Sequence, residues 1–179
     1  MKKSWENEIE VLISIKKEIK DKDINEIWEF NLPQKAAADD EIQKIELKLG
    51  YTLDEAYVSF LKIANGWKAI NQAIDLFGTN ELLDSEQMNY AQILLKTLSE
   101  DGVLHASGFD YDELLPIAVS RYDTDLFVIA KNGSNCPGII IWFAGYEVER
   151  YDNFEEFFRA IVEYNRLNIQ YLNDGLMDI

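Results

Sequence analysis

Hydrophobic residues recur at helical spacing near the start of the chain. The first set, which falls on one face of a helix, is Trp5, Ile9, Leu12, Ile13 and Ile19. The spacing continues through Ile24, Ile27, Trp28 and Phe30. It stops at Leu32-Pro33, because proline interrupts a helix. We therefore expect residues 1–35 to form a helical extension ahead of a main domain at 36–179.

Two shorter helices, with their ends marked, are predicted between residues 42 and 66. Ile42, Ile45 and Leu49 share one helical face, and Gly50 follows where a left-handed cap favours glycine. Thr52 and Glu55 have the spacing of a capping box, which predicts the start of the second helix. Its apolar stripe is Leu53, Tyr57, Phe60, Leu61 and Ala64. Asn65-Gly66 is predicted to end this helix. We expect this stripe to pack on the strands predicted at 126–130 and 139–143.

Between residues 68 and 108 the pattern is less regular. Residues 73–77 are predicted as a short strand. Residues 82–98 have the spacing of one helix, with Met88, Ile93 and Leu94 as its buried members.

From residue 114 the pattern changes to strands and then back to a helix. Residues 114–119, 126–130 and 139–143 are short apolar runs bounded by turn residues, which is typical of buried antiparallel strands. Residues 147–151 alternate, as in a half-exposed strand near an edge. The closing helix carries Phe154, Phe157, Phe158 and Ile161. The predicted fold is α+β: a single domain whose mainly antiparallel β-sheet is packed by N-terminal and C-terminal helices.

The predicted helix pair resembles the signature of the SMI1/KNR4, or SUKH, family. The matching positions are Glu46, Leu49, Gly50, Leu53, Tyr57, Phe60, Leu61, Asn65 and Gly66. Asp54 stands where the family has proline, and a carboxylate is tolerated there because it faces the positive end of the helix dipole. Less specific similarity downstream extends the resemblance over residues 36–165.

The resemblance implies a SUKH-like fold and a binding role without catalysis. Bacterial members are associated with immunity to polymorphic toxins, including nucleases, and act by binding the toxin. Fungal members are regulatory scaffolds that bind endogenous partners.

Composition agrees with one domain of 179 residues, 47% of them hydrophobic. Cys136 is the only cysteine, so no internal disulfide forms. The start of the chain lacks the apolar run of a signal peptide, and no run is long enough to span a bilayer. We expect a cytoplasmic protein.

The net charge of the protein indicates which class of molecule it binds. The formal net charge is −16, yet residues 1–22 hold six lysines against five acids. Residues 98–158 hold twelve acids against three basic residues, a local balance of −9. Such a surface repels nucleic acids and anionic membranes and attracts a basic protein.

Candidate catalytic groups are few. His105 is the only histidine, which excludes multi-histidine metal sites, and Cys136 lies in a turn sequence with no evident histidine partner. No glycine-rich phosphate loop is present. We expect no cofactor, no metal and no enzymatic activity.

Acidic residues on both sides of the strand predicted at 114–119 form the candidate site. Acids at alternate positions could share Ca²⁺ or act as an acid and base pair, although neither stretch matches an EF-hand loop. Neighbouring aromatics favour a docking surface instead, since interfaces combine aromatic anchors with a charged rim. The candidate partner-binding residues are Phe109, Asp110, Tyr111, Asp112, Glu113, Tyr122, Asp123 and Asp125.

Three functional hypotheses follow. The first is a non-enzymatic immunity protein that neutralises a cognate bacterial toxin, a basic nuclease-type domain. The second is a regulatory scaffold of the SMI1/KNR4 type that binds an endogenous partner. The third is a carboxylate-based enzyme.

Overall fold

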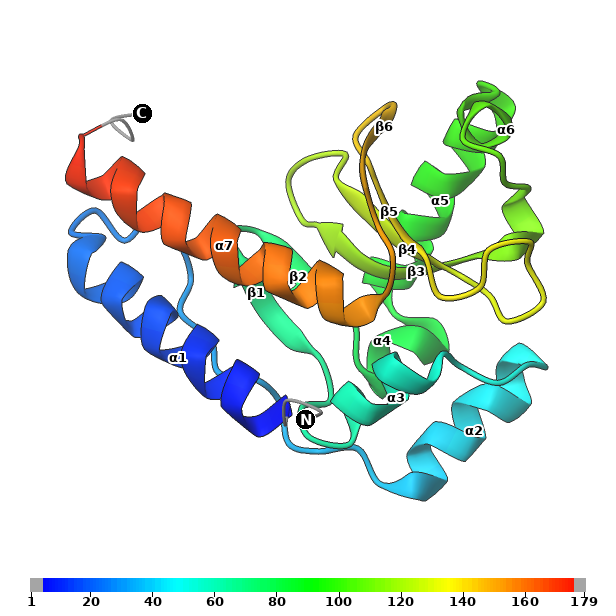
Figure 1. Cartoon of the computed structure of the whole chain (residues 1–179), viewed down its shortest axis with the longest axis horizontal. Helices are drawn as coiled ribbons and strands as arrows, with labels where there is room; N and C mark the ends of the chain where they lie inside the picture. Colours follow the sequence, from blue (N-terminus) through cyan, green and yellow to red (C-terminus); the bar gives the residue numbers. More distant parts are fainter. Residues whose placement is uncertain (1–4, 176–179) are drawn as a thin grey trace.

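A six-stranded antiparallel sheet runs through the molecule, in a computed structural model that describes residues 5–175 (Figure 1). Each strand pairs with the next strand in sequence, so the sheet is a simple meander. The strands are β1 (Trp67–Asn71), β2 (Ile74–Leu76), β3 (Leu114–Ser120), β4 (Leu126–Ala130), β5 (Ile140–Phe143) and β6 (Glu147–Tyr151). The predicted α+β class is confirmed.

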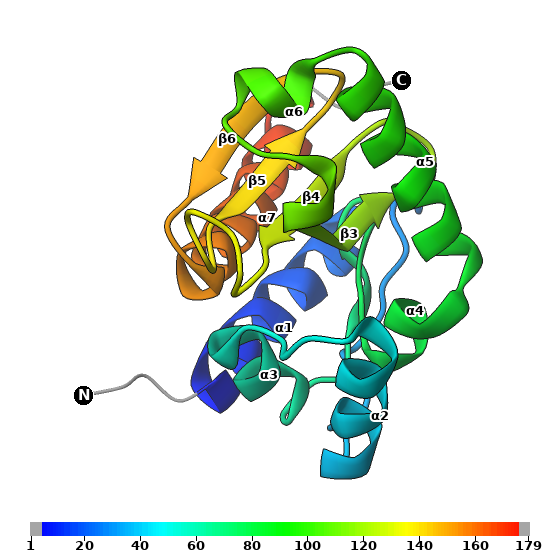
Figure 2. The same ribbon diagram turned by 90° about the vertical axis from the view of Figure 1, so that its right-hand side faces the viewer.

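Helices cover both faces of this sheet. Helices α1 (Trp5–Lys22) and α7 (Phe154–Asn173) lie side by side on one face, and α5 (Glu86–Glu100) packs on β3 and β4 from the other (Figure 2). The shorter helices are α2 (Asp39–Leu49), α3 (Glu55–Leu61), α4 (Thr79–Asp84), α6 (Val103–Ala106) and the 3₁₀ turn η1 (Tyr111–Glu113). No helix among residues 5–175 combines the length and apolar character needed to cross a membrane.

Aromatic rings join the beginnings of α1, α3 and α7. Phe154 lies 5.6 Å from Trp5, 5.0 Å from Tyr57 and 5.2 Å from Phe60, measured between ring centroids. Phe158 lies 5.5 Å from Phe60 and 5.4 Å from Trp5. The aromatic neighbours of Phe60 thus come from α1 and α7, and Phe60 shares one hydrophobic core with the residues of β4 and β5.

The predicted helix pair is present, with one correction at the start of α3. Gly50 has φ = 79°, the left-handed cap expected, and the whole apolar stripe of α3 is buried. The N-cap is Asp54 rather than Thr52: one carboxylate oxygen accepts from the amides of Ala56 and Tyr57, both at 3.0 Å. The Thr52 hydroxyl instead accepts from Asn132 Nδ2 at 3.1 Å. The nearer carboxylate prevails because Asp is a stronger N-cap than Thr.

The first helix is shorter than its periodicity suggests. It ends at Lys22, and the carboxylate of Asp23 then accepts from the amides of Ile27 and Trp28 at 3.0 and 2.9 Å. These side-chain hydrogen bonds compete with helical ones and turn the chain. The predicted continuation through residues 24–30 is therefore wrong, and Ile24 is 90% exposed.

The middle region needs three corrections. Strand β1 was not predicted, although its partner β2 matches the strand expected at 73–77. The helix expected at 82–98 is divided between α4 and α5, because Ser85 accepts from the Met88 amide at 2.9 Å and starts a new helix. Met88 is buried as predicted, but Ile93 is 62% exposed.

The strands of the second half match their predictions closely. Strands β3, β4 and β5 fill the apolar runs, and β4 pairs antiparallel with β5. Strand β6 forms one edge of the sheet with a mostly exposed pattern. Helix α7 covers the sheet through a contact of 5.3 Å between the rings of Phe157 and Phe127.

A buried lysine connects α1 to the irregular strand β1. Lys16 is 6% exposed, and its Nζ donates to the carbonyl oxygen of Ala69 at 2.6 Å. Ala69 has φ = 51°, and its amide donates to Asp75 Oδ1 at 2.7 Å. Burial lowers the pKa of Lys16 from 10.5 to about 8, because removal from water disfavours the charged form.

Replacing Phe60 by alanine should lower the free energy of unfolding by about 3 to 5 kcal/mol, the usual cost of removing a buried aromatic ring. Chemical denaturation measures this. Ile93→Ala, at an exposed position, is the control and should change stability by less than about 0.5 kcal/mol. A loss below about 1 kcal/mol for Phe60→Ala would show that Phe60 is not part of the core.

Lys16 should make stability rise with pH in the alkaline range. Between its folded pKa of about 8 and its ordinary value of 10.5, the unfolded chain binds more protons than the folded one. From pH 7.5 to 9.5 the Lys16 contribution should increase the free energy of unfolding by about 1 to 2 kcal/mol. Urea denaturation of Lys16→Met, compared with the original chain at both values, should show that this increment is missing. Equal pH dependence in the two proteins would contradict the prediction.

Candidate functional site

The predicted site residues form two groups at opposite ends of β3. Residues 109–113 precede the strand and residues 122–125 follow it. A strand of seven residues, at about 3.3 Å each, separates the groups by roughly 20 Å. The two groups therefore do not touch one another directly.

Helix α5 connects the two groups. The Tyr111 hydroxyl donates to Gln92 Oε1 at 2.6 Å, while the Tyr90 hydroxyl donates to the carbonyl oxygen of Asp123 at 3.2 Å. One helix thus contacts both acidic segments. We call the resulting surface the α5 face and define it as the exposed residues Tyr90, Ile93, Asp110, Tyr111, Asp112, Tyr122 and Asp123.

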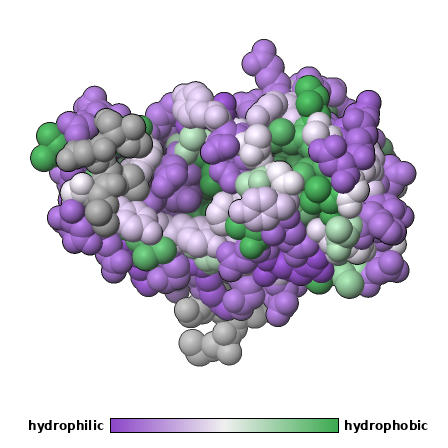
Figure 3. Space-filling model, turned by 90° about the horizontal axis from the view of Figure 1, so that it is seen from above, coloured by the Kyte–Doolittle hydropathy of each residue, from purple (hydrophilic) through white to green (hydrophobic). Residues whose placement is uncertain are grey.

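The α5 face combines exposed apolar groups with acids. Tyr122 is 82% exposed and Ile93 is 62% exposed. The guanidinium of Arg121 lies 5.5 Å from the Tyr122 ring centroid, which restrains that ring. Seen from above, the molecule is mostly hydrophilic, with the larger group of hydrophobic residues to the right of the centre and smaller ones toward the left (Figure 3). Large exposed aromatics beside acids are suited to protein docking.

Three of the predicted site residues make contacts within the fold. Phe109 is 4% exposed and lies under the guanidinium of Arg150, so it belongs to the core. Glu113 caps η1, since its Oε2 accepts from the Asp110 amide at 2.8 Å. Asp125 accepts from Trp142 Nε1 at 2.7 Å. Burial raises the pKa of the Asp125 carboxyl, and this hydrogen bond opposes the rise.

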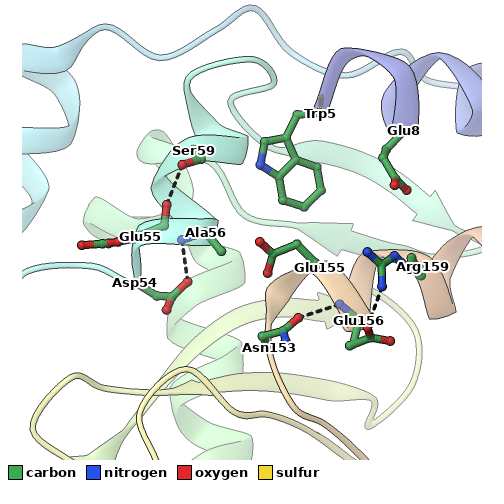
Figure 4. A pocket seen from close by; sticks show the side chains of 10 residues that line it. All are labelled: Trp5, Glu8, Asp54, Glu55, Ala56, Ser59, Asn153, Glu155, Glu156 and Arg159. Carbon is green, nitrogen blue, oxygen red and sulfur yellow. Dashed lines mark hydrogen bonds and ion pairs between the residues drawn. The ribbon is translucent and has the colours of Figure 1, made fainter. Parts of the chain in front are cut away.

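A second candidate site lies where α1, α3 and α7 begin, and the sequence analysis did not identify it. It is a cavity of about 750 Å³ (Figure 4). Its lining residues are Trp5, Glu8, Asp54, Glu55, Ala56, Ser59, Asn153, Glu155, Glu156 and Arg159. Five of these are carboxylates, against one arginine.

The carboxylates gather there because helix starts favour them. Glu55 lies in the first turn of α3, and Glu155 and Glu156 lie in the first turn of α7. Negative side chains are stabilised near the positive end of the helix dipole. The only sequence signal was the acid after each cap, and nothing local indicated that these helix starts would meet.

The arrangement does not favour metal or acid and base chemistry at the predicted carboxylates. Asp123 Oδ1 accepts from the Thr124 amide at 2.7 Å, and Asp125 is engaged by Trp142. Among residues 5–175, no group of three or more histidine, cysteine or acidic side chains is arranged to hold a metal ion. Asp123 therefore serves the turn between β3 and β4, and Asp125 holds the indole of Trp142 on β5.

We expect the purified protein to carry no stoichiometric metal, because its candidate ligands already hold backbone and indole donors. Elemental analysis after exhaustive dialysis should give less than about one tenth of a metal ion per chain. One tightly held ion per chain, lost in Asp123→Asn, would contradict this.

A known protein family matches most of the chain. Residues 36–160 match the SMI1 / KNR4 family (SUKH-1). The match includes both ends of the α5 face and the beginning of α7, whereas α1 lies before it. No curated protein matches the chain.

Proposed function

Because this chain belongs to the SMI1/KNR4 family (SUKH-1), we propose that it is a non-catalytic immunity protein. In this proposal it binds a cognate bacterial toxin directly and blocks it. The toxin domain is basic, as a nuclease is where it holds its substrate. A cytoplasmic location is part of the proposal, since a toxin of this kind acts on nucleic acids inside the cell.

Charge is the observation that supports this proposal most strongly. The protein carries −16 overall, and residues 98–158, which supply most of the α5 face, carry −9. Asp110, Asp112 and Asp123 are exposed there beside Tyr111 and Tyr122. Acids of this kind can take the place of nucleic-acid phosphates on a basic groove, while the aromatic rings supply buried area on contact.

The mechanism follows from these two features. Exposed acids accelerate encounter with a basic partner, toward the order of 10⁸ M⁻¹s⁻¹ at low salt. After encounter, Tyr111, Tyr122 and Ile93 lose their exposure to water and slow dissociation. Neutralisation then requires only that the bound protein covers the nucleic-acid groove of the toxin.

The test is co-expression with the cognate toxin domain, which the proposal expects to be encoded by a neighbouring gene. The original chain should protect the cells, and Asp110→Asn/Asp112→Asn/Asp123→Asn should protect less. Its association rate should fall about tenfold at low salt, and the difference should shrink as salt screens the charges. Stability should change by less than about 0.5 kcal/mol for each exposed substitution.

A matched control removes three acids away from the α5 face: Asp21→Asn/Asp40→Asn/Asp174→Asn. This variant has the same net charge and should protect like the original. Death of the cells in the presence of the original protein would contradict the immunity role for that pair. A stable complex with a non-toxic endogenous protein, without protection, would favour the regulatory scaffold.

A further inference from the structure

The chain contains two asparagine–glycine pairs, Asn65-Gly66 and Asn132-Gly133. An asparagine in such a pair can lose its side-chain amide, because glycine has no Cβ to keep its backbone nitrogen away from the asparagine side chain. The structure treats the two pairs differently. We propose that Asn132 is a site of spontaneous deamidation, that Asn65 is protected, and that the change at Asn132 releases a contact between two loops.

The reaction needs only water as a co-reactant. The backbone nitrogen of Gly133 attacks Cγ of Asn132 and gives up its proton, and the side-chain nitrogen leaves as ammonia. The product is a cyclic imide. Water then opens the ring at either of its two carbonyl groups, which leaves aspartate or its isomer with the main chain running through the side chain. Nothing is oxidised or reduced, and the chain gains one carboxylate.

The turn at Asn132-Gly133 is open to this reaction. The turn is closed by the Ser134 amide, which donates to the carbonyl oxygen of Lys131 at 2.9 Å. Asn132 and Gly133 are both exposed. The Gly133 amide donates no hydrogen bond within residues 5–175, so it is available as the attacking group. Because both central residues lie at the surface, the turn can open without uncovering the core.

The pair Asn65-Gly66 has the same chemistry but is held in place. Asn65 is 7% exposed, and its side chain makes two hydrogen bonds with Thr79, one to Oγ1 at 2.6 Å and one from the amide at 2.7 Å. The Gly66 amide donates to the carbonyl oxygen of Ala64 at 2.9 Å. Ring closure there would break hydrogen bonds inside the protein, which is costly. Asn65 therefore serves as an internal control.

The side chain of Asn132 ties the loop between β4 and β5 to the linker between α2 and α3. Its Nδ2 donates to the carbonyl oxygen of Thr52 at 3.0 Å and to Thr52 Oγ1 at 3.1 Å, and the carbonyl oxygen of Leu53 lies at 3.4 Å. The two carbonyl oxygens can only accept, and a carboxylate has no hydrogen to donate. Deamidation therefore replaces this attraction by repulsion between oxygen atoms.

The same loop supports η1 at one end of the α5 face. Lys131 Nζ donates to the carbonyl oxygen of Asp112 at 2.8 Å, and the Asn135 amide donates to Glu113 Oε1 at 3.3 Å. Release of the loop would thus reach the acidic segment before β3. The deamidation itself does not depend on what the α5 face binds, and its test needs no partner protein.

The test follows the purified protein during storage at mildly alkaline pH, by digestion and mass spectrometry, with freshly prepared protein as the zero point. Replacing the amide nitrogen by oxygen raises the mass, and fragmentation assigns the change to one residue. Asn132 should convert severalfold faster than Asn65. Gly133→Ala should slow the conversion of Asn132 severalfold, because a methyl group hinders ring closure. This variant should keep the fold, since an added Cβ meets no atom within 4 Å. An unchanged Asn132, or the same rate in Gly133→Ala, would overturn the proposal.

Asn132→Asp imitates one product, and Asn135→Asp is its matched control. The control adds the same charge to the same loop, and the Asn135 side chain makes no hydrogen bond within residues 5–175. Amide hydrogen exchange at residues 50–54 and 131–135 should be faster in Asn132→Asp than in Asn135→Asp, because only the first change breaks the contact between the loops. Equal exchange in the two variants would overturn the proposed release.

Discussion

The packing of rings around Phe154 determines much of this structure. Phe154 opens α7 and contacts Trp5, Tyr57 and Phe60, which come from the first described turn of α1 and from α3. Burying these rings together brings three helix starts to one place and directs α7 across the sheet. The same packing creates the acidic cavity, because the carboxylates that favour each helix start must then share one region.

The sequence correctly predicted those elements whose formation depends on residues that are close together in the chain. Gly50 ends α2 as expected, and the stripe around Phe60 is buried as expected. Thr52 failed as an N-cap because α3 begins later, where the Asp54 carboxylate accepts from the amides of Ala56 and Tyr57. Ile93 failed as a core residue because its helical face is decided by where α5 meets β3 and β4, which the sequence pattern does not encode locally.

The sequence predicted which types of residue the candidate site contains. It did not predict how these residues are placed relative to one another. Asp110 and Asp123 are exposed, yet they lie at opposite ends of β3 and are related through α5. Phe109 directly precedes these acids in the sequence, but its side chain is buried, and the guanidinium of Arg150 lies over its ring. The residues that line the cavity come from three segments that are far apart in the sequence. Only the packing of rings that brings these segments together could have indicated the cavity.

The pairing of α1 with α7 has a consequence during synthesis of the chain. Trp5 contacts Phe154, and Lys22 donates to Asn173, so the two helices run in the same direction although about 150 residues separate them. Every strand, in contrast, pairs with its neighbour in sequence. At roughly 5 to 20 residues per second, α1 is made about 7 to 30 seconds before α7. During that interval its apolar face, which includes Leu12 and Ile15, has no partner helix, and chaperones can bind it.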